Sequence, residues 1–312
     1  MVLCYHFKMS ENFNELTVFA PAKVNLHLAV FDRRQDGYHN LESVFLAVDF
    51  GDTLRFFTER GNSNKECKIE MSGDNLRSIS MKDNIIYRAL SLFRAKTGYS
   101  EDLKIKVDKQ IPSGGGLGGG SSDAAAALLA LNKIAGFPCS QRDLLDLALT
   151  LGSDVPFFIH ETSCAYVSGR GEHVSPFNAP LLHLVIVNPG FPSDTAAAFR
   201  LLDKNREKNG EICVRNDDFA MRNELMKNSS FLTAGSTFFN DFLDVFPENE
   251  KTVYLEIISQ LKEVGAYFAN LSGSGSTCFG IFKDMEYARK AAELLDKKWN
   301  FVKAVKTYFV SK

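Results

Sequence analysis

Residues 103–134 read LKIKVDKQIPSGGGLGGGSSDAAAALLALNKI, in which a strand pattern, a run of glycines and a helix pattern follow one another. LKIKVD alternates apolar and polar residues as a short strand does, and the Ala/Leu run after Ser122 is typical of a buried helix. Between them, six of the seven residues from Gly114 to Gly120 are glycine. Glycine lets the backbone approach a ligand closely, and a helix N-terminus offers unpaired N–H groups and a partial positive charge. The sequence therefore predicts a strand, a glycine loop and a helix that together bind phosphate.

Better-known motifs fit this loop poorly. The spacing Gly114-x-Gly116-x-x-Gly119 matches the dinucleotide fingerprint, but that motif needs an acidic residue at the end of a strand about 20 residues later, where residues 134–147 show a helical pattern. A Walker A loop needs Lys before its Ser/Thr, whereas glycine precedes Ser121. The His-Arg-Asp and Asp-Phe-Gly motifs of protein kinases are absent. A flexible linker is also disfavoured, because linkers do not usually end in a strongly apolar helix.

An alternating stretch, TVFAPAKVNLHLAV, occupies residues 17–30. Every second residue from Val18 to Val30 is apolar, and this period of two predicts a strand with those residues on one face. Lys23 and Asn25 then share the opposite face, together with His27, which we interpret as structural. An Asp-Gly turn signal follows, and LESVFLAVDF predicts the next strand.

The rest of the chain mixes helical and strand patterns, which indicates an α+β protein. We predict helices over 83–96 (capped by Asp83), 140–151, 251–264 and 284–298, and strands from residue 164, over 181–190 and over 301–310, with a hairpin over 266–282. The polar run 202–218 is predicted to be a solvated loop or helix end. A boundary near 155–165 divides the chain into predicted domains 1–160 and 161–312.

The composition excludes several classes of protein. The chain has 36 Lys+Arg and 38 Asp+Glu, a net charge of −2 without a basic cluster, which argues against a nucleic-acid partner. Its 45% hydrophobic and 24% charged residues exclude disordered and fibrous classes. No apolar run reaches the ~18 residues of a membrane span, and the N-terminus lacks signal or transit-peptide features, so we expect a cytoplasmic protein without a membrane partner. Six widely spaced cysteines predict reduced thiols.

Six motifs together carry a family resemblance. PSGGGLGGGSS (112–122) resembles the phosphate loop of the GHMP small-molecule kinases, and NLSGSGST (270–277) resembles their C-terminal glycine motif. Within that superfamily, four further motifs are similar to those of the 4-diphosphocytidyl-2-C-methyl-D-erythritol kinase family, in the expected order: APAKVNL (20–26), DGYH (36–39), GDT (51–53) and GSDVPFF (152–158). The chain departs from the family in its extension before Thr17 and in a polar insertion near 203–218.

The resemblance implies a two-domain GHMP kinase fold, with an N-terminal ATP-binding domain like ribosomal protein S5 domain 2, a ferredoxin-like C-terminal domain and an active site between them. It implies ATP-dependent phosphorylation of the 2-hydroxyl of 4-diphosphocytidyl-2-C-methyl-D-erythritol, on the non-mevalonate route to isoprenoids. The alternatives are another GHMP kinase, for mevalonate, homoserine or a sugar, and a nucleotide-binding regulatory protein without activity. DGYH and AKVNL favour the cytidylyl substrate, and the presence of Lys23 and Asp154 favours an active enzyme.

The same resemblance implies roles for individual residues. Asp154 would accept the proton of the substrate hydroxyl, although a lone Ser-Asp more often caps a helix. Lys23 would orient the hydroxyl and stabilise developing charge, and Asn25 would hydrogen-bond substrate. Tyr38 would stack on the cytosine and His39 would hydrogen-bond its edge, their alternative being a packed turn. Two further substrate contacts are expected, a polar one from Thr195 and an opposing stack from Phe199.

The ATP site implied by the resemblance consists of the glycine loop and a neighbouring helix start. We expect Lys109 to lie near the adenine and Ser121 and Ser122 to cap the helix or approach Mg²⁺. Magnesium follows from ATP chemistry, since no carboxylate cluster predicts metal ligands. We expect a monomer or weak dimer. The full set of expected ATP-binding residues is Pro112, Ser113, Gly114, Gly115, Gly116, Leu117, Gly118, Gly119, Gly120, Ser121, Ser122, Asn84 and Ile85.

Overall fold

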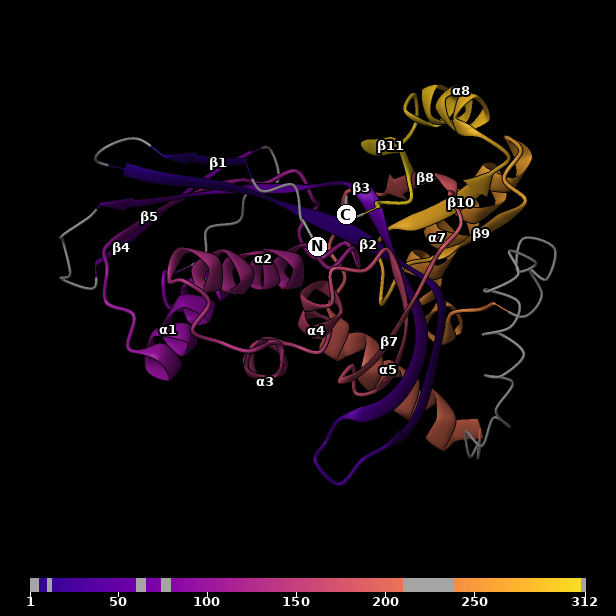
Figure 1. The fold of residues 1–312 in the computed structure, drawn as a ribbon. Coiled ribbons are helices and arrows are strands. Elements are labelled where there is room, and N and C mark those ends of the chain that lie inside the picture. Colours follow the sequence, from indigo (N-terminus) through magenta and orange to yellow (C-terminus); the bar gives the residue numbers. More distant parts are fainter. Residues whose placement is uncertain (1–5, 10–12, 60–65, 74–79, 210–237, 310–312) are drawn as a thin grey trace.

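The computed structural model describes residues 6–9, 13–59, 66–73, 80–209 and 238–309. In these residues the strands form a seven-stranded and a four-stranded sheet (Figure 1). The first sheet contains β1 (His6–Met9), β2 (Phe13–Arg33), β3 (His39–Glu59), β4 (Cys67–Ser72), β5 (Leu103–Asp108), β6 (Cys164–Gly169) and β7 (His173–Phe177). The second contains β8 (His183–Asn188), β9 (Phe268–Leu271), β10 (Cys278–Phe282) and β11 (Phe301–Lys306). The helices are α1 (Ile85–Thr97), α2 (Gly119–Ile134), α3 (Gln141–Leu151), α4 (Val155–Ile159), α5 (Thr195–Asn209), the 3-10 helix η2 (Asp241–Asp244), α7 (Glu248–Glu263) and α8 (Met285–Leu295).

A long antiparallel ribbon of β2 and β3 connects the two halves of the molecule. Its far end pairs with β5, and the part near its hairpin pairs with β6. The register of the ribbon shifts between Pro21 and Ala22. Val18 packs among the helices over the first sheet, whereas Val24, six residues later, packs against the second sheet. The prediction of one continuous apolar face is therefore wrong at Pro21, and beyond this irregularity Lys23 lies on the helix side of the ribbon, beside the glycine loop.

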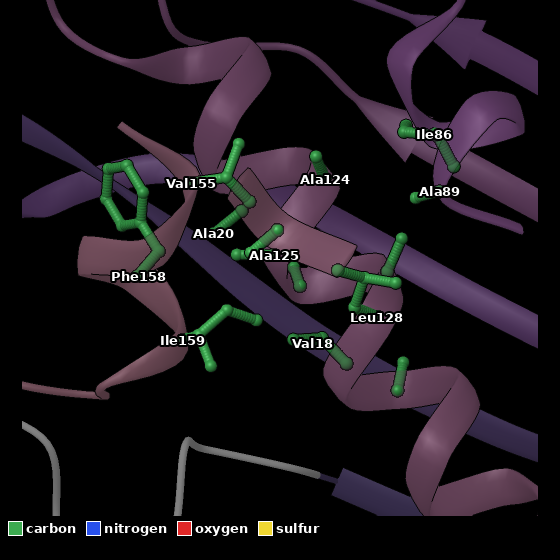
Figure 2. Packing of buried hydrophobic residues seen from close by; sticks show 14 of the residues in the cluster. Val18, Ala20, Ile86, Ala89, Ala124, Ala125, Leu128, Val155, Phe158 and Ile159 are labelled. Carbon is green, nitrogen blue, oxygen red and sulfur yellow. The ribbon is translucent and has the colours of Figure 1, made fainter. Parts of the chain in front are cut away.

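Helices α1 to α4 cover one face of the first sheet. Figure 2 shows how α2 packs there, with Ala124, Ala125 and Leu128 close to Val18 and Ala20 of β2. Alanine side chains are short, so they let the helix backbone lie close to the strand. The run of alanines after the glycine loop thus fixes the start of α2 against the ribbon that carries Lys23.

The second sheet is buried on both faces. Leu184 and Ile186 of β8 face the ribbon, and Val185 and Val187 face the layer of α7 and α8. This two-sided burial explains why β8 and β10 read as continuous apolar runs. The two sheets with their covering helices form a two-domain α+β architecture.

Most predicted elements are confirmed, with two differences in detail. Asn84, not Asp83, caps α1, because its side chain accepts the Ile86 N–H, while Asp83 bonds Ser80. β6 and β7 continue the first sheet, so the change of sheet falls between Phe177 and His183. The domain division at 160/161 stays a prediction. Residues 202–209 belong to α5, and the remainder of the 202–218 run lies outside the described residues.

The structure also bears on the thiols and on membrane spans. Cys67, Cys139, Cys164 and Cys278 are free, while Cys4 and Cys213 lie outside the described residues. No helix within the described ranges is both long and apolar enough to cross a bilayer.

Candidate active site

A cavity of about 950 Å³ lies where the ribbon, the glycine loop, α5 and the β6–β7 turn meet. Every residue predicted for the site lines this cavity except Ser122. The glycine loop and α1 form one part of the wall, and the hairpin of β2 and β3 together with α5 forms another. The sequence motifs, which are scattered over the chain, are therefore brought together by the fold.

The ammonium group of Lys23 is held among three oxygen acceptors. It donates to Asn25 Oδ1 at 2.7 Å and to the Gly116 carbonyl at 3.1 Å, and it lies 3.3 Å from Asp154 Oδ2. The Phe45 ring lies 4.8 Å from Nζ and excludes water on that side. Since Lys23 is only 3% exposed, its charge is compensated by these partners and is fixed in position.

Asp154 begins the short helix α4, yet its side chain makes no capping hydrogen bond. The structure thus does not support the capping alternative. Its carboxylate is 32% exposed and faces the cavity, while the apolar residues that follow it, Val155, Phe157 and Phe158, are buried behind it. A carboxylate in this position is anchored by its helix and remains reachable by a ligand in the cavity.

The glycine loop depends on backbone that only glycine adopts without strain. Gly116 has φ +75°, and a side-chain carbon there would lie 2.1 Å from the Ser272 carbonyl oxygen. Gly118 has φ +70° and is the N-cap of α2. Its added carbon would meet Cγ of Lys23 at 3.0 Å. The close approach of loop and neighbours is therefore possible because these residues lack side chains.

The C-terminal glycine motif supports the glycine loop from the second domain. The Thr277 N–H donates to the Gly115 carbonyl at 3.1 Å, and Ser272 Oγ donates to the Gly116 carbonyl at 2.9 Å. From β2, the Lys23 N–H donates to the Leu117 carbonyl at 3.0 Å. These bonds use carbonyl groups of the loop, and they fix its shape from both domains.

The prediction that Ser121 and Ser122 cap α2 is wrong. The helix begins two residues earlier, with Gly118 as N-cap and no side-chain cap. Ser122 is buried within the first turn, where its N–H donates to the Gly118 carbonyl and its hydroxyl has no partner. Only Ser121 of the two lines the cavity. The start of α2 thus faces the cavity with backbone N–H groups that no side chain of the helix satisfies.

A buried charge network that the sequence did not predict lies under the start of α2. Lys109 donates to the carboxylates of Asp52 and Asp123, the latter at 2.6 Å. Asp52 also accepts the N–H groups of Gln110 (2.6 Å) and Ile111 (2.9 Å), just before the glycine loop. Lys109 lines the cavity, and its place near the adenine stays a prediction. Its charge is already committed to the two carboxylates, which hold the entry of the loop.

This network predicts a pH dependence of stability. Burial raises the pKa of Asp123 to about 7, despite the opposing effect of Lys109. The folded protein then binds more protons than the unfolded chain between about pH 4 and pH 7, so this group's contribution to the free energy of unfolding falls as pH rises through that window. Asn does not titrate, so Asp123→Asn should lose less unfolding free energy than the wild type when the pH is raised from 5 to 8. We expect the two losses to differ by about 1 kcal/mol or more. Urea unfolding at both pH values measures this, and parallel curves for the two proteins would contradict it.

The adenine side of the predicted site is formed by the start of α1. Asn84 is buried, with Oδ1 on the Ile86 N–H at 2.9 Å and Nδ2 3.4 Å from Met71 Sδ. Ile85 follows it in the cavity wall. Asn84 therefore has a capping role of its own, and contact with a nucleotide stays a prediction.

The predicted substrate residues lie at the hairpin end of the cavity. His39 is buried, its Nε2 is 2.7 Å from Asp203 Oδ1, and the Phe199 ring stacks on it at 4.9 Å with an angle of 20°. Tyr38 is half exposed. Thr195 Oγ1 lies 2.8 Å from Ser274 Oγ, which ties α5 to the C-terminal glycine motif. Phe199 therefore contacts His39 here, and its predicted stack on cytosine stays a prediction.

Asp203 is a site residue that the sequence analysis missed. It lies one helical turn after Phe199 on α5, so the two share a helix face. The polar run that starts at residue 202 was interpreted as solvated, which hid this spacing. Extending a helical pattern by one turn beyond Phe199 would have placed Asp203 on the same helix face.

Comparison with known proteins decides the family. Residues 84–162 match the family model of the GHMP kinases N terminal domain, and residues 213–300 match that of the GHMP kinases C terminal domain. The chain is 36% identical to the 4-diphosphocytidyl-2-C-methyl-D-erythritol kinase of Xanthomonas axonopodis pv. citri, over 88% of this chain and 82% of that protein. The chain belongs to the 4-diphosphocytidyl-2-C-methyl-D-erythritol kinase family.

Other members of this kinase family and a solved structure agree. The kinase of the same name from Thermodesulfovibrio yellowstonii is 34% identical over 91% of this chain and 95% of its own. A crystal structure of 4-(cytidine 5'-diphospho)-2C-methyl-D-erythritol kinase superposes with a TM-score of 0.74 at 30% identity, over 93% of this chain and 98% of that one. L. major mevalonate kinase, at 13% identity and a TM-score of 0.65 over 100% and 99% of the chains, shares the fold. As a member of this kinase family, the chain uses ATP.

Proposed function

We propose that this protein transfers the γ-phosphoryl group of ATP to the 2-hydroxyl of 4-diphosphocytidyl-2-C-methyl-D-erythritol, a step of the methylerythritol phosphate route to isoprenoids. The observation that carries the proposal is the pairing of Lys23 with Asp154 beside the glycine loop, in one cavity with Tyr38 and His39. The part of the cavity with Lys23, Asp154 and the glycine loop suits phosphoryl transfer, and the part with Tyr38 and His39 suits a nucleoside base. The names of the curated relatives support the same substrate.

Phosphoryl transfer requires an acceptor for the hydroxyl proton and compensation for developing charge. We assign the proton to Asp154, whose carboxylate is exposed to the cavity. Lys23 would hold that carboxylate and the substrate oxygen in line with the γ-phosphorus and stabilise negative charge in the transition state. Asn25, which accepts a hydrogen bond from Lys23 and donates to Ser43 Oγ at 2.8 Å, would fix the direction of the ammonium group.

The phosphates of ATP would lie against the N–H groups at the start of α2, where the helix dipole favours anions. Magnesium would neutralise part of the phosphate charge when bound. The described residues contain no group of three or more His, Cys, Asp or Glu suited to a metal. They fit an ion held mainly by phosphates and water, and the Ser121 hydroxyl at the start of α2 would be a protein ligand. A monomeric or weakly dimeric state and a cytoplasmic location stay predictions from the sequence.

The substrate base would be read by His39. When Nε2–H donates to Asp203, a neutral imidazole presents Nδ1 as a hydrogen-bond acceptor. Cytosine offers an exocyclic amine to such an acceptor, whereas uracil has a carbonyl oxygen at the same position. The Asp203 carboxylate would thus select the tautomer that distinguishes the two bases.

This reasoning predicts that the uridine analogue of the substrate is a poor one, because the mismatch leaves polar groups unpaired and a site built on hydrogen bonds rejects it by about 10² or more. His39→Ala should reduce the ratio of kcat/KM between the cytidine substrate and its uridine analogue. Tyr38→Ala should lower kcat/KM for both substrates by a similar factor, since stacking is worth about 1–3 kcal/mol for any base. Steady-state kcat/KM for both substrates in the three proteins measures this. Equal kcat/KM of the wild type for the two substrates would show that the pocket does not distinguish cytosine from uracil.

The product of the reaction tests the proposed function directly. Carbon 2 of the acceptor carries a methyl group and no hydrogen, so a phosphate on its oxygen shows no three-bond coupling to a proton on that carbon. We expect the proton-coupled ³¹P spectrum to contain a new phosphomonoester singlet beside the diphosphate signals. A multiplet would indicate phosphorylation at another hydroxyl, and ADP formation with inorganic phosphate as the only new signal would indicate hydrolysis of ATP.

A further inference from the structure

Arg170 is a cation of the cavity wall that the catalytic assignment does not use. It lies in the turn between β6 and β7, and its guanidinium carbon lies 4.9 Å from the centre of the Tyr38 ring. Within the described part of the chain, no carboxylate forms an ion pair with it. The carboxylate in its electrostatic range is Asp36, whose pKa is lowered first by the Tyr38 N–H, then by Arg34 and last by Arg170.

The other arginines in this region are engaged. Arg34 pairs with Asp36 at 3.1 Å and with Glu172 at 3.5 Å. Arg33 donates to the Gly37 carbonyl at 3.2 Å, and Arg200, on the exposed rim, lies 3.8 Å from Asp194. Arg170 therefore differs from Arg34 and Arg200 in having no carboxylate partner among the described residues, and from Arg33 in that its guanidinium donates no hydrogen bond to any of them.

The turn that carries Arg170 also packs against the start of α4. Gly171 has φ +130°, and a side-chain carbon there would lie 2.2 Å from the Ser153 carbonyl oxygen. Ser153 directly precedes Asp154, and both line the same cavity. The turn therefore spans the distance between Asp154 and the Tyr38 ring, which are the two points assigned to opposite ends of the substrate.

We infer that the guanidinium of Arg170 binds the diphosphate of the cytidylyl substrate. The inference rests on the proposed function, in which the reacting hydroxyl lies at Asp154 and the base at Tyr38 and His39. The diphosphate connects these two ends covalently, so it must cross the region between them, where Arg170 lies. A guanidinium presents a planar fork of donors that matches phosphate oxygens, and the Tyr38 ring supports it from the side.

Binding measurements separate this role from support of Tyr38 alone. Cytidine 5'-diphosphate carries the base and the diphosphate, and cytidine carries the base only. We expect Arg170→Gln to raise the Kd of cytidine 5'-diphosphate about 10-fold or more, because hydrogen bonds to charged groups are lost, and to change the Kd of cytidine less than about 2-fold. Arg170→Lys keeps the charge but lacks the planar fork of donors, so its Kd for cytidine 5'-diphosphate should lie between those of the wild type and Arg170→Gln. The matched control is Arg289→Gln, which removes the same charge from the exposed face of α8 and should leave both values unchanged.

Calorimetric titration, with cytidine measured by competition, gives these values, and a non-hydrolysable ATP analogue reports on the intact ATP site. Equal weakening of cytidine and cytidine 5'-diphosphate would overturn the inference in favour of simple support of Tyr38. Unchanged binding of both by Arg170→Gln would overturn it as well. If the wild type itself bound neither ligand, the proposed function would fail first, and the inference with it.

Discussion

Asp154→Asn lowers kcat by about 10² or more, on the usual worth of a general base, while the affinity for ATP changes little. The substitution keeps the size of the side chain and removes its ability to take the hydroxyl proton. Because Asp154 makes no capping hydrogen bond, α4 should not depend on its charge, and Lys23 keeps Asn25 and the Gly116 carbonyl as acceptors. The matched control is Asp146→Asn on the exposed side of α3, which should behave as wild type.

The same reasoning applies to Lys23, the ion-pair partner of Asp154, and is tested by Lys23→Met alone and combined with Asp154→Asn. The two side chains lie 3.3 Å apart and would act as a unit, so the double variant should lose about as much kcat as the worse single variant. Steady-state kinetics on all four proteins measures the coupling. Strictly additive losses, or near-wild-type turnover of Asp154→Asn in a clean preparation, would contradict the assignment.

Gly118→Val weakens binding of ATP by about 10-fold or more. A left-handed conformation costs a residue with a side chain about 1–2 kcal/mol, and a branched one more. The added atoms would also press on Lys23 and on Phe158, whose Cζ lies 3.3 Å from the first carbon. Turnover should therefore fall together with affinity, while thermal stability falls modestly.

Gly120→Ala is the matched control for the loop. Its added carbon would contact only Ile85 Cγ2, at 3.9 Å, and its φ is not in the left-handed region. Alanine favours helix over glycine by up to about 1 kcal/mol, so stability should hold or rise. Calorimetric titration with a non-hydrolysable ATP analogue compares the variants. Equal affinity of Gly118→Val and wild type would mean that the loop does not hold the phosphates.

What the sequence predicted well is local. The glycine loop and α2 follow from one continuous stretch, and Ser140, where the predicted helix 140–151 begins, is the N-cap of α3. The hairpin of β9 and β10 was predictable for the same reason, since both strands and their turn are neighbours in the chain. In each case the pattern that specifies the element lies within the element.

What the sequence left open depends on contacts between distant segments. The change of face at Pro21 comes from the register of β2 against β3, which no single strand encodes. Lys109 is 57 residues from Asp52, and His39 is 164 residues from Asp203, so neither pair shows as a motif. The predicted cap at Ser122 failed because Gly118 starts the helix earlier, in a conformation set by contacts of the glycine loop.

We propose that this kinase acts on the cytidylyl polyol and not on the other acceptors of its superfamily. The most direct measurement is kcat/KM for 4-diphosphocytidyl-2-C-methyl-D-erythritol, mevalonate, homoserine and galactose, with ATP as donor and ADP release as readout. We predict a preference for the cytidylyl substrate of about 10³ or more, since the other acceptors leave the hydrogen-bonding groups of the base pocket unpaired. Comparable or faster turnover of any of the other three would contradict the claim.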